Sequence, residues 1–245
     1  MMKRFLLALA FIMPGAAFAA GYGGPLDKAE YDLRDNASLQ RGAQIFMNYC
    51  MGCHNAQYQR YQRTFNDIGI PLELGEEYLQ FTGDGVGDHM WSSIDTEASG
   101  EWFGIAPPDL TMVARVRGAD WLYTFFRSFY VDPERPFGVN NEVFSNVGMP
   151  WVLEELQGTP RKTWERRMVD GEMKDVYVGI KSDGNGKLSP EEFDQAMLDL
   201  TNFLVYMGEP MQLERKRLGY FVIGFLIVLL ILTILLKKEY WRDIK

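Results

Sequence analysis

The sequence contains little cysteine, little histidine and no excess of positive charge. Its 245 residues include two cysteines and two histidines, and two cysteines are too few for a disulfide-stabilised scaffold. Lysine and arginine number 25 against 33 aspartate and glutamate, a net charge of −8, which argues against nucleic acid as a partner. There is no internal repeat, and a hydrophobic content of 47% excludes general disorder.

Long apolar runs occur only at the two ends of the chain. At the start, Lys3 and Arg4 precede a nine-residue apolar stretch over 5–13, and Ala17 to Ala19 forms a small-x-small site. Nine residues cannot span a bilayer, so this segment predicts a secretory signal that is cleaved after residue 19.

The second apolar run covers residues 218–236 near the C-terminus. As a helix its 19 residues would measure about 28 Å, close to the thickness of the hydrocarbon layer, which predicts a transmembrane span. Basic residues flank both ends, so their balance does not fix the orientation. The export signal fixes the orientation instead. It predicts a periplasmic domain over 20–217 and a cytoplasmic tail over 237–245.

The predicted external domain is strongly acidic. Residues 20–217 contain 19 Lys and Arg against 31 Asp and Glu, a net charge of −12. Such a domain attracts basic partners at low salt, although the same charge also serves solubility, and composition alone does not separate the two.

The chemistry is concentrated at Cys50-Met51-Gly52-Cys53-His54. Cys-x-x-Cys-His is the attachment signal for c-type haem, in which the two thiols add across the porphyrin vinyl groups and the histidine becomes an iron ligand. Alternatives are a thioredoxin-like redox pair, half of a zinc site, or a structural disulfide. A redox pair would not need His54, and a zinc site would need more ligands than His89 supplies.

Two amphipathic helices bracket the domain. Leu39, Ala43, Phe46 and Cys50 recur on one helical face before the motif, and Ser189 to Glu192 forms a capping box for a helix that Gly208 ends. We therefore expect a mainly α fold resembling a class I cytochrome c domain, with extended loops and the C-terminal transmembrane helix. The segment 118–130 is aromatic on all sides and predicts a helix that is buried either in the core or against the haem, while 161–180 predicts a small hairpin.

The sixth ligand of the haem iron is less clearly marked in the sequence than the haem attachment motif. Met149 lies between Gly148 and Pro150, and this setting suits a loop that presents one sulfur to a fixed iron. On the residues alone, Met112, Met90 and His89 remain alternatives. The segment 183–192 imitates a calcium-binding loop, but Lys181 occupies the first ligand position, so we interpret it as a turn.

Together, these segments resemble the cytochrome c1 family, the haem subunit of ubiquinol–cytochrome c reductase (the bc1 complex), from about Pro25 to Trp241. The segments that carry the resemblance, besides the haem motif, are Ala106-Pro107-Pro108-Asp109-Leu110, Arg115-Val116-Arg117, Asn146-Val147-Gly148-Met149-Pro150 and Met207-Gly208-Glu209-Pro210 before the anchor. A bare Cys-x-x-Cys-His is shared by many cytochromes, whereas these four segments in this order are far more specific.

The resemblance implies a role for each matching residue. Cys50 and Cys53 would form the thioether bonds, His54 and Met149 would be the axial ligands, and Arg117 would hold a haem propionate. Trp121 stands roughly where some relatives have a haem-contacting tyrosine, so that contact stays open.

The resemblance also implies a function and partners. With its iron positions filled, the haem would carry electrons and perform no substrate chemistry of its own, accepting them from the Rieske iron–sulfur protein beside cytochrome b and passing them to a soluble cytochrome c. The alternatives are an anchored mono-haem cytochrome of another respiratory complex, or a single-haem enzyme with an open iron position.

Overall fold

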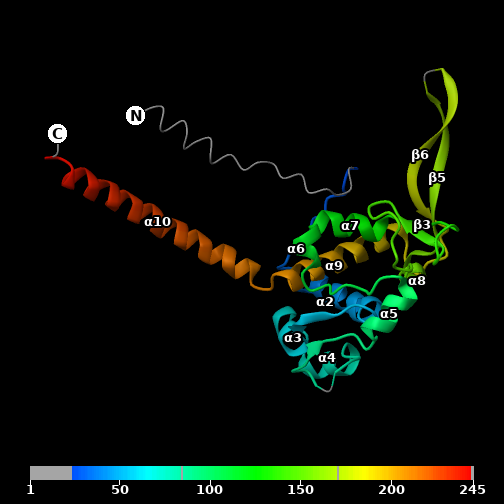
Figure 1. The fold of residues 1–245 in the computed structure, drawn as a ribbon, viewed down its shortest axis with the longest axis horizontal. Helices are drawn as coiled ribbons and strands as arrows, with labels where there is room; N and C mark the ends of the chain where they lie inside the picture. Colours follow the sequence, from blue (N-terminus) through cyan, green and yellow to red (C-terminus); the bar gives the residue numbers. More distant parts are fainter. Residues whose placement is uncertain (1–23, 84, 170, 244–245) are drawn as a thin grey trace.

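The computed structural model describes residues 24–83, 85–169 and 171–243 (Figure 1). The predicted signal over residues 1–19 lies outside them. The described elements, in chain order, are α2 (Asn36–Ile45), the π-helical turn η1 (Phe46–Cys50), β1 (Ala56–Arg60), α3 (Tyr61–Ile68), α4 (Leu72–Tyr78), β2 (His89–Met90), α5 (Thr96–Phe103), α6 (Val113–Arg117), α7 (Ala119–Arg127), β3 (Phe129–Val131), β4 (Val139–Asn141), α8 (Glu154–Gln157), β5 (Pro160–Val169), β6 (Glu172–Ser182), α9 (Pro190–Gly208) and α10 (Gln212–Tyr240).

The centre of the domain is the contact between α2 and α9, the first and last helices of its body (Figure 1). All the apolar positions that the sequence places on the inner faces of these helices are buried: Leu39, Ala43, Phe46, Cys50, Phe193, Met197, Leu200, Leu204 and Met207. Met197 and Met207 are therefore core residues, as predicted. The mainly α fold is confirmed.

Gly42 allows the two helices to approach at backbone distance. A Cβ at this position would lie 2.1 Å from the carbonyl oxygen of Asp199 and 2.8 Å from Cβ of Phe203. No side chain larger than hydrogen fits there, so glycine is accepted inside a helix despite its unfavourable propensity.

A buried carboxylate joins the same two helices. The Asp199 side chain accepts hydrogen bonds from Ser38 Oγ at 2.7 Å and from Arg41 Nε at 2.6 Å, and Gln195 Nε2 donates to it at 3.0 Å. Both carboxylate oxygens of Asp199 thus accept hydrogen bonds from neighbouring donors, as a buried charge requires. The network fixes how α2 lies along α9.

The termini of both helices follow the capping rules. The Asp35 side chain accepts from Ser38 N at the start of α2. At the start of α9, Ser189 and Glu192 form the reciprocal capping box that the sequence predicts, with Pro190 at the first helical position.

The aromatic segment 118–130 differs from its prediction. The helix α7 ends at Arg127, and Phe129 and Tyr130 belong to β3, which pairs with β4. Phe125, Phe126 and Phe129 are buried, but Trp121 and Tyr123 are only half-buried. The helix stops early because the backbone of β3 pairs with β4, a strand that follows later in the chain.

The hairpin over 161–180 is confirmed but is longer than expected. Its strands β5 and β6 pair from Pro160 with Ser182 to Val169 with Glu172, and the hairpin projects away from the body (Figure 1). Its base is attached to β3, where Lys162 Nζ lies 3.8 Å from the ring centre of Tyr130. The calcium-like segment that follows is a turn leading into α9, as interpreted.

One helix among the described residues is long and apolar enough to cross a membrane. This is α10, which contains the predicted span 218–236 and extends beyond it at both ends. None of its apolar stretch is buried against the body, and it leaves the domain as a single rod (Figure 1). At its base, Glu209 forms ion pairs with Arg115 of α6 and with Arg215 of α10.

Replacing Gly42 tests the helix contact. We expect Gly42→Ala to lower the free energy of unfolding by about 2–3 kcal/mol, because the added methyl group must displace the backbone of α9. Urea unfolding of the haem-loaded protein measures this. Gly87→Ala is the control, because no atom lies within 4 Å of its added Cβ, and it should change stability by less than about 0.5 kcal/mol. Equal effects of the two variants would contradict the proposed close approach.

Candidate functional site

The site begins at the tight turn that contains both cysteines. The π-helical turn η1 ends at Cys50, and the backbone N–H groups of Cys53 and His54 both donate to the carbonyl oxygen of Cys50, at 3.1 and 2.9 Å. This turn places Cys50 inside the core and leaves Cys53 and His54 partly exposed. Both thiols are free.

His54 is held in one tautomer by a backbone carbonyl. Its Nδ1 lies 2.8 Å from the carbonyl oxygen of Pro108, and because a carbonyl only accepts, Nδ1 carries the proton and donates it. Nε2 therefore keeps its lone pair. Burial lowers the pKa of His54 below its usual value, which also favours the neutral ring. A neutral imidazole with Nδ1 anchored is the form in which histidine binds a metal.

The environment of Cys50 argues against a thiol redox pair. Burial raises the pKa of Cys50 to about 12, whereas redox-active cysteines have lowered pKa values so that the thiolate is available. The zinc alternative receives no support either. In residues 24–83, 85–169 and 171–243 there is no group of three or more His, Cys, Asp or Glu side chains that could hold a metal ion.

The segment 103–110 connects the haem motif to the Met149 loop. At one end, the Pro108 carbonyl oxygen accepts a hydrogen bond from His54 Nδ1, and Leu110 N donates to the Asn55 carbonyl at 2.8 Å. At the other end, a Cβ on Gly148 would lie 3.1 Å from the carbonyl oxygen of Phe103. The structure thus brings His54 and the residue before Met149 against one short segment, although the sequence separates them by more than 90 positions.

The four candidates for the sixth ligand have different surroundings. Met149 is half-buried at the edge of the core. Met90 is fully buried in β2, where it pairs with Ala56, and Met112 is exposed just before α6. His89 Nδ1 lies 2.6 Å from the carbonyl oxygen of Gln57. Among these candidates, Met149 is the one whose loop contacts the segment that also holds His54.

Arg117 lies at the end of α6 with its guanidinium above aromatic rings. The guanidinium carbon lies 5.0 Å from the ring centre of Trp121 and 5.6 Å from that of Phe144. Trp121 in turn stacks on Phe125 with ring centres 4.9 Å apart. Among the ion pairs found in the described part of the chain, none involves Arg117, so its charge is available to an external anion.

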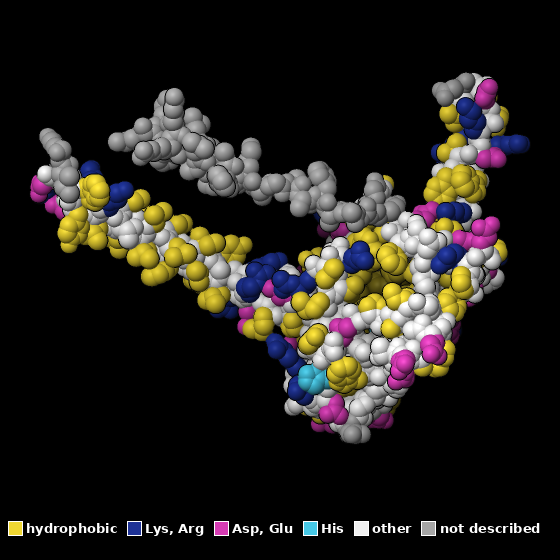
Figure 2. Space-filling model, in the orientation of Figure 1, with side chains coloured by type: hydrophobic (Ala, Val, Ile, Leu, Met, Phe, Trp, Pro, Cys, Tyr) yellow, Lys and Arg dark blue, Asp and Glu magenta, His cyan; other side chains and the backbone are white. Residues whose placement is uncertain are grey.

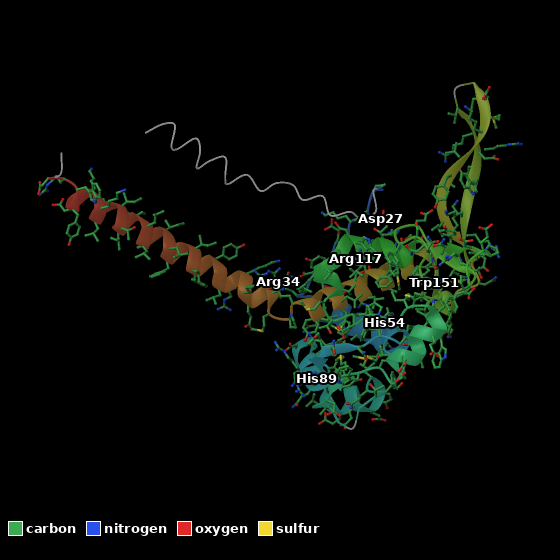
Figure 3. All side chains as sticks on the ribbon, in the orientation of Figure 1. Asp27, Arg34, His54, His89, Arg117 and Trp151 are labelled. Atoms are coloured by element: carbon green, nitrogen blue, oxygen red, sulfur yellow. The ribbon has the colours of Figure 1, made fainter. Side chains whose placement is uncertain are left out.

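The surface between these residues is hollowed and apolar. Figure 2 shows a depression lined with hydrophobic side chains in one face of the body. In the same view, Figure 3 labels Arg117 beside this position. Nearby, Ile105 and Phe144 remain exposed although they are large and hydrophobic. A flat apolar group with acidic substituents fits this arrangement, since it would cover the apolar side chains and meet Arg117 at the rim.

Several residues around the motif could not be found from the sequence. Ser92 N donates to Asn55 Oδ1 at 2.6 Å, and Ser92 Oγ donates to the Gly52 carbonyl at 2.9 Å, so the segment after β2 supports the motif. Single polar contacts between distant loops leave no periodic pattern in a sequence. The Pro108 carbonyl likewise carries no side-chain signal.

Comparison with known proteins identifies the Cytochrome C1 family, although one similar protein carries a different description. The model of the Cytochrome C1 family matches residues 84–244, a range that begins after the Cys-x-x-Cys-His motif. Over their full lengths, this chain and cytochrome c1 of Allochromatium vinosum are 47% identical. A protein of Nitrosomonas europaea described as ammonia monooxygenase gamma subunit is 42% identical over 99% of both chains. Yeast mitochondrial cytochrome c1 is 25% identical over 94% of this chain and 72% of its own length.

Replacing Met149 tests the ligand assignment. Met149→Leu roughly keeps the side-chain volume and removes the sulfur, so the loop should fold and haem should attach. We expect loss of the ferric sulfur–iron charge-transfer band, carbon monoxide binding in the ferrous form, and a lower reduction potential. Met90→Leu and Met112→Leu are the controls. If either control loses the band while Met149→Leu keeps it, the assignment is wrong.

Proposed function

The chain belongs to the cytochrome c1 family, whose members carry covalently attached haem c, and from this premise we propose that it passes single electrons within a bc1-type quinol-oxidising complex. One observation carries this proposal most directly. His54 is held as the neutral Nδ1–H tautomer, in the same turn as two free thiols and beside an apolar hollow. That combination suits a covalently fixed haem with histidine as its ligand.

Each residue of the site has a proposed role. Cys50 and Cys53 would attach the haem through two thioether bonds, and His54 Nε2 and the Met149 sulfur would bind its iron. Arg117 pairs with a propionate, for which it is prepared by stacking on Trp121 and Phe144. When bound, the haem supplies reversible one-electron chemistry, at a potential that a thioether ligand raises.

Neighbouring residues position the two proposed iron ligands. Pro108 orients His54, and Gly148 seats the Met149 loop against Phe103. With His54 and Met149 both bound to the iron, small molecules would have no free coordination position to enter. This separates an electron carrier from a single-haem enzyme, which needs one position open.

We also propose the orientation and the partners of the domain. The helix α10 can anchor the chain as a single span, and the N-terminal signal would place the haem domain in the periplasm, at the inner membrane. There the Rieske iron–sulfur protein would donate electrons, and cytochrome b would neighbour the anchor.

The charge distribution supports a basic electron acceptor. Between Arg63 and Arg115 the sequence has ten acidic residues and no lysine or arginine. Within this acidic segment, Trp91, Trp102 and Ile105 are at least half exposed. Exposed apolar side chains within an acidic segment suit brief docking of a soluble cytochrome c with a basic surface.

Removing both cysteines tests the proposed function. In the Cys50→Ala, Cys53→Ala double variant we expect no haem on the denatured chain after acid–acetone extraction, because no thiol can form a thioether. Quinol oxidation by membranes that contain only this variant should stop. Met51→Leu is the matched control, since it changes a buried residue inside the same motif and leaves both thiols in place. Covalent haem in the double variant would refute the proposal.

The salt dependence of electron transfer tests the acidic docking surface. We expect the bimolecular rate with a basic cytochrome c to fall as ionic strength rises from about 0.01 to 0.1 M, since the screening length shrinks from about 30 to 10 Å. Replacing Glu76 and Glu77 of α4 by glutamine should lower the low-salt rate. Glu191→Gln at the start of α9 is the control. A rate that does not depend on salt would mean that the charge has no part in docking.

A further inference from the structure

The loop before Met149 contains an unusual backbone conformation. Asn146 has φ of +62°, the only positive φ at a non-glycine residue in the described part of the chain. Asparagine tolerates this left-handed region better than most residues, but the conformation persists only where the surroundings hold it. The contacts of Asn146 therefore decide the path of the chain toward Met149.

Arg135 holds Asn146 from one side. Its Nη1 donates to Asn146 Oδ1 and its Nη2 donates to the Asn146 carbonyl oxygen, both at 3.1 Å. Two parallel bonds from a planar guanidinium fix orientation as well as distance. The Nε of Arg135 is buried without a hydrogen-bond partner, so among the described residues the hydrogen bonds of the guanidinium are the two to Asn146.

Asn140 holds Asn146 from the other side. Its Oδ1 accepts the Asn146 N–H at 2.9 Å, and its Nδ2 donates to Asp132 Oδ2 at the same distance. Asn140 lies in β4, where it pairs with Tyr130, and its side chain is buried. Three of the four polar groups of Asn146, namely its N–H, its carbonyl and its amide oxygen, are therefore bound to Arg135 and Asn140 of the β3–β4 hairpin.

The three residues after Asn146 transmit this constraint. Val147 is buried, and a Cβ on Gly148 would lie 3.1 Å from the Phe103 carbonyl oxygen, which is closer than an ordinary contact. Pro150 then restricts Met149 to an extended backbone. With Asn146 held by Arg135 and Asn140 and Gly148 close to Phe103, the backbone that leads to Met149 is restricted on both sides of Val147.

We propose that Arg135, acting through Asn146, is a positioning residue that keeps the Met149 sulfur in place toward the haem iron. The proposal rests on the proposed function, in which Met149 is an axial ligand. It means that the bond between Met149 and the iron is stabilised by Arg135 and Asn140 of the β3–β4 hairpin, which lie outside the segment that carries Met149.

Arg135→Gln tests the clamp. The variant removes two hydrogen bonds from a charged donor, so the form with Met149 displaced should become about tenfold more populated. We expect carbon monoxide to bind the ferrous holoprotein about tenfold faster, and the ferric charge-transfer band to disappear at a lower temperature than helix unfolding. Arg135→Lys, which can donate to the same oxygens, should recover part of the wild-type rate. Arg161→Gln, on the exposed hairpin, is the control.

The outcomes separate the clamp from the ligand assignment. If the unaltered protein shows the band, Met149→Leu loses it and Arg135→Gln behaves as the unaltered protein, the clamp is refuted and the ligand stands. If Met149→Leu keeps the band, the ligand assignment itself fails, and with it the proposed role of Arg135. Should Arg135→Gln not accumulate as holoprotein, Asn146→Gly decides, because it keeps the left-handed backbone but loses the Oδ1 contact. An unchanged carbon monoxide rate in Asn146→Gly overturns the proposal.

Discussion

The close approach of α2 and α9 at Gly42 is the contact on which the rest of the domain depends. The two helices meet where a Cβ would lie 2.1 Å from the Asp199 carbonyl, and the buried Asp199 side chain then joins α9 to Ser38 and Arg41 of α2. Because α2 continues through η1 into Cys50, this contact also sets the position of the haem motif. At the other end of α9, Glu209 pairs with Arg115 and Arg215 and so connects the same helix to the anchor.

The site itself is assembled from loops that this helical frame supports. The segment 103–110 contacts His54 at one end and Gly148 at the other, so it relates the two proposed axial ligands without carrying either. The β3–β4 hairpin holds Asn146 through Arg135 and Asn140. An electron carrier benefits from such rigidity, because a ligand set that moves little between oxidation states lowers the reorganisation that each electron transfer requires.

Charge and hydrophobicity are distributed over separate parts of the molecule. The acidic segment between Arg63 and Arg115 contains exposed apolar residues, which suits a transient partner, while α10 is apolar throughout its central part, which suits lipid. The long β5–β6 hairpin belongs to neither part. Its charged side chains pair largely within the hairpin, as Arg167 does with Glu165 and Arg166 with Asp175.

The sequence by itself determined the features that local pattern encodes. The Cys-x-x-Cys-His spacing, the capping box at Ser189, the inner faces of α2 and α9 and the apolar run within α10 each follow from neighbours a few positions apart. Tertiary structure alone decided that α7 ends before Phe129, that Pro108 orients His54, and that Arg135 reaches Asn146. These depend on backbone carbonyls and single polar contacts between segments that only the packed fold brings together, and a carbonyl is the same in every residue. For that reason the sequence could indicate which residues would hold a haem, but not what holds those residues in place.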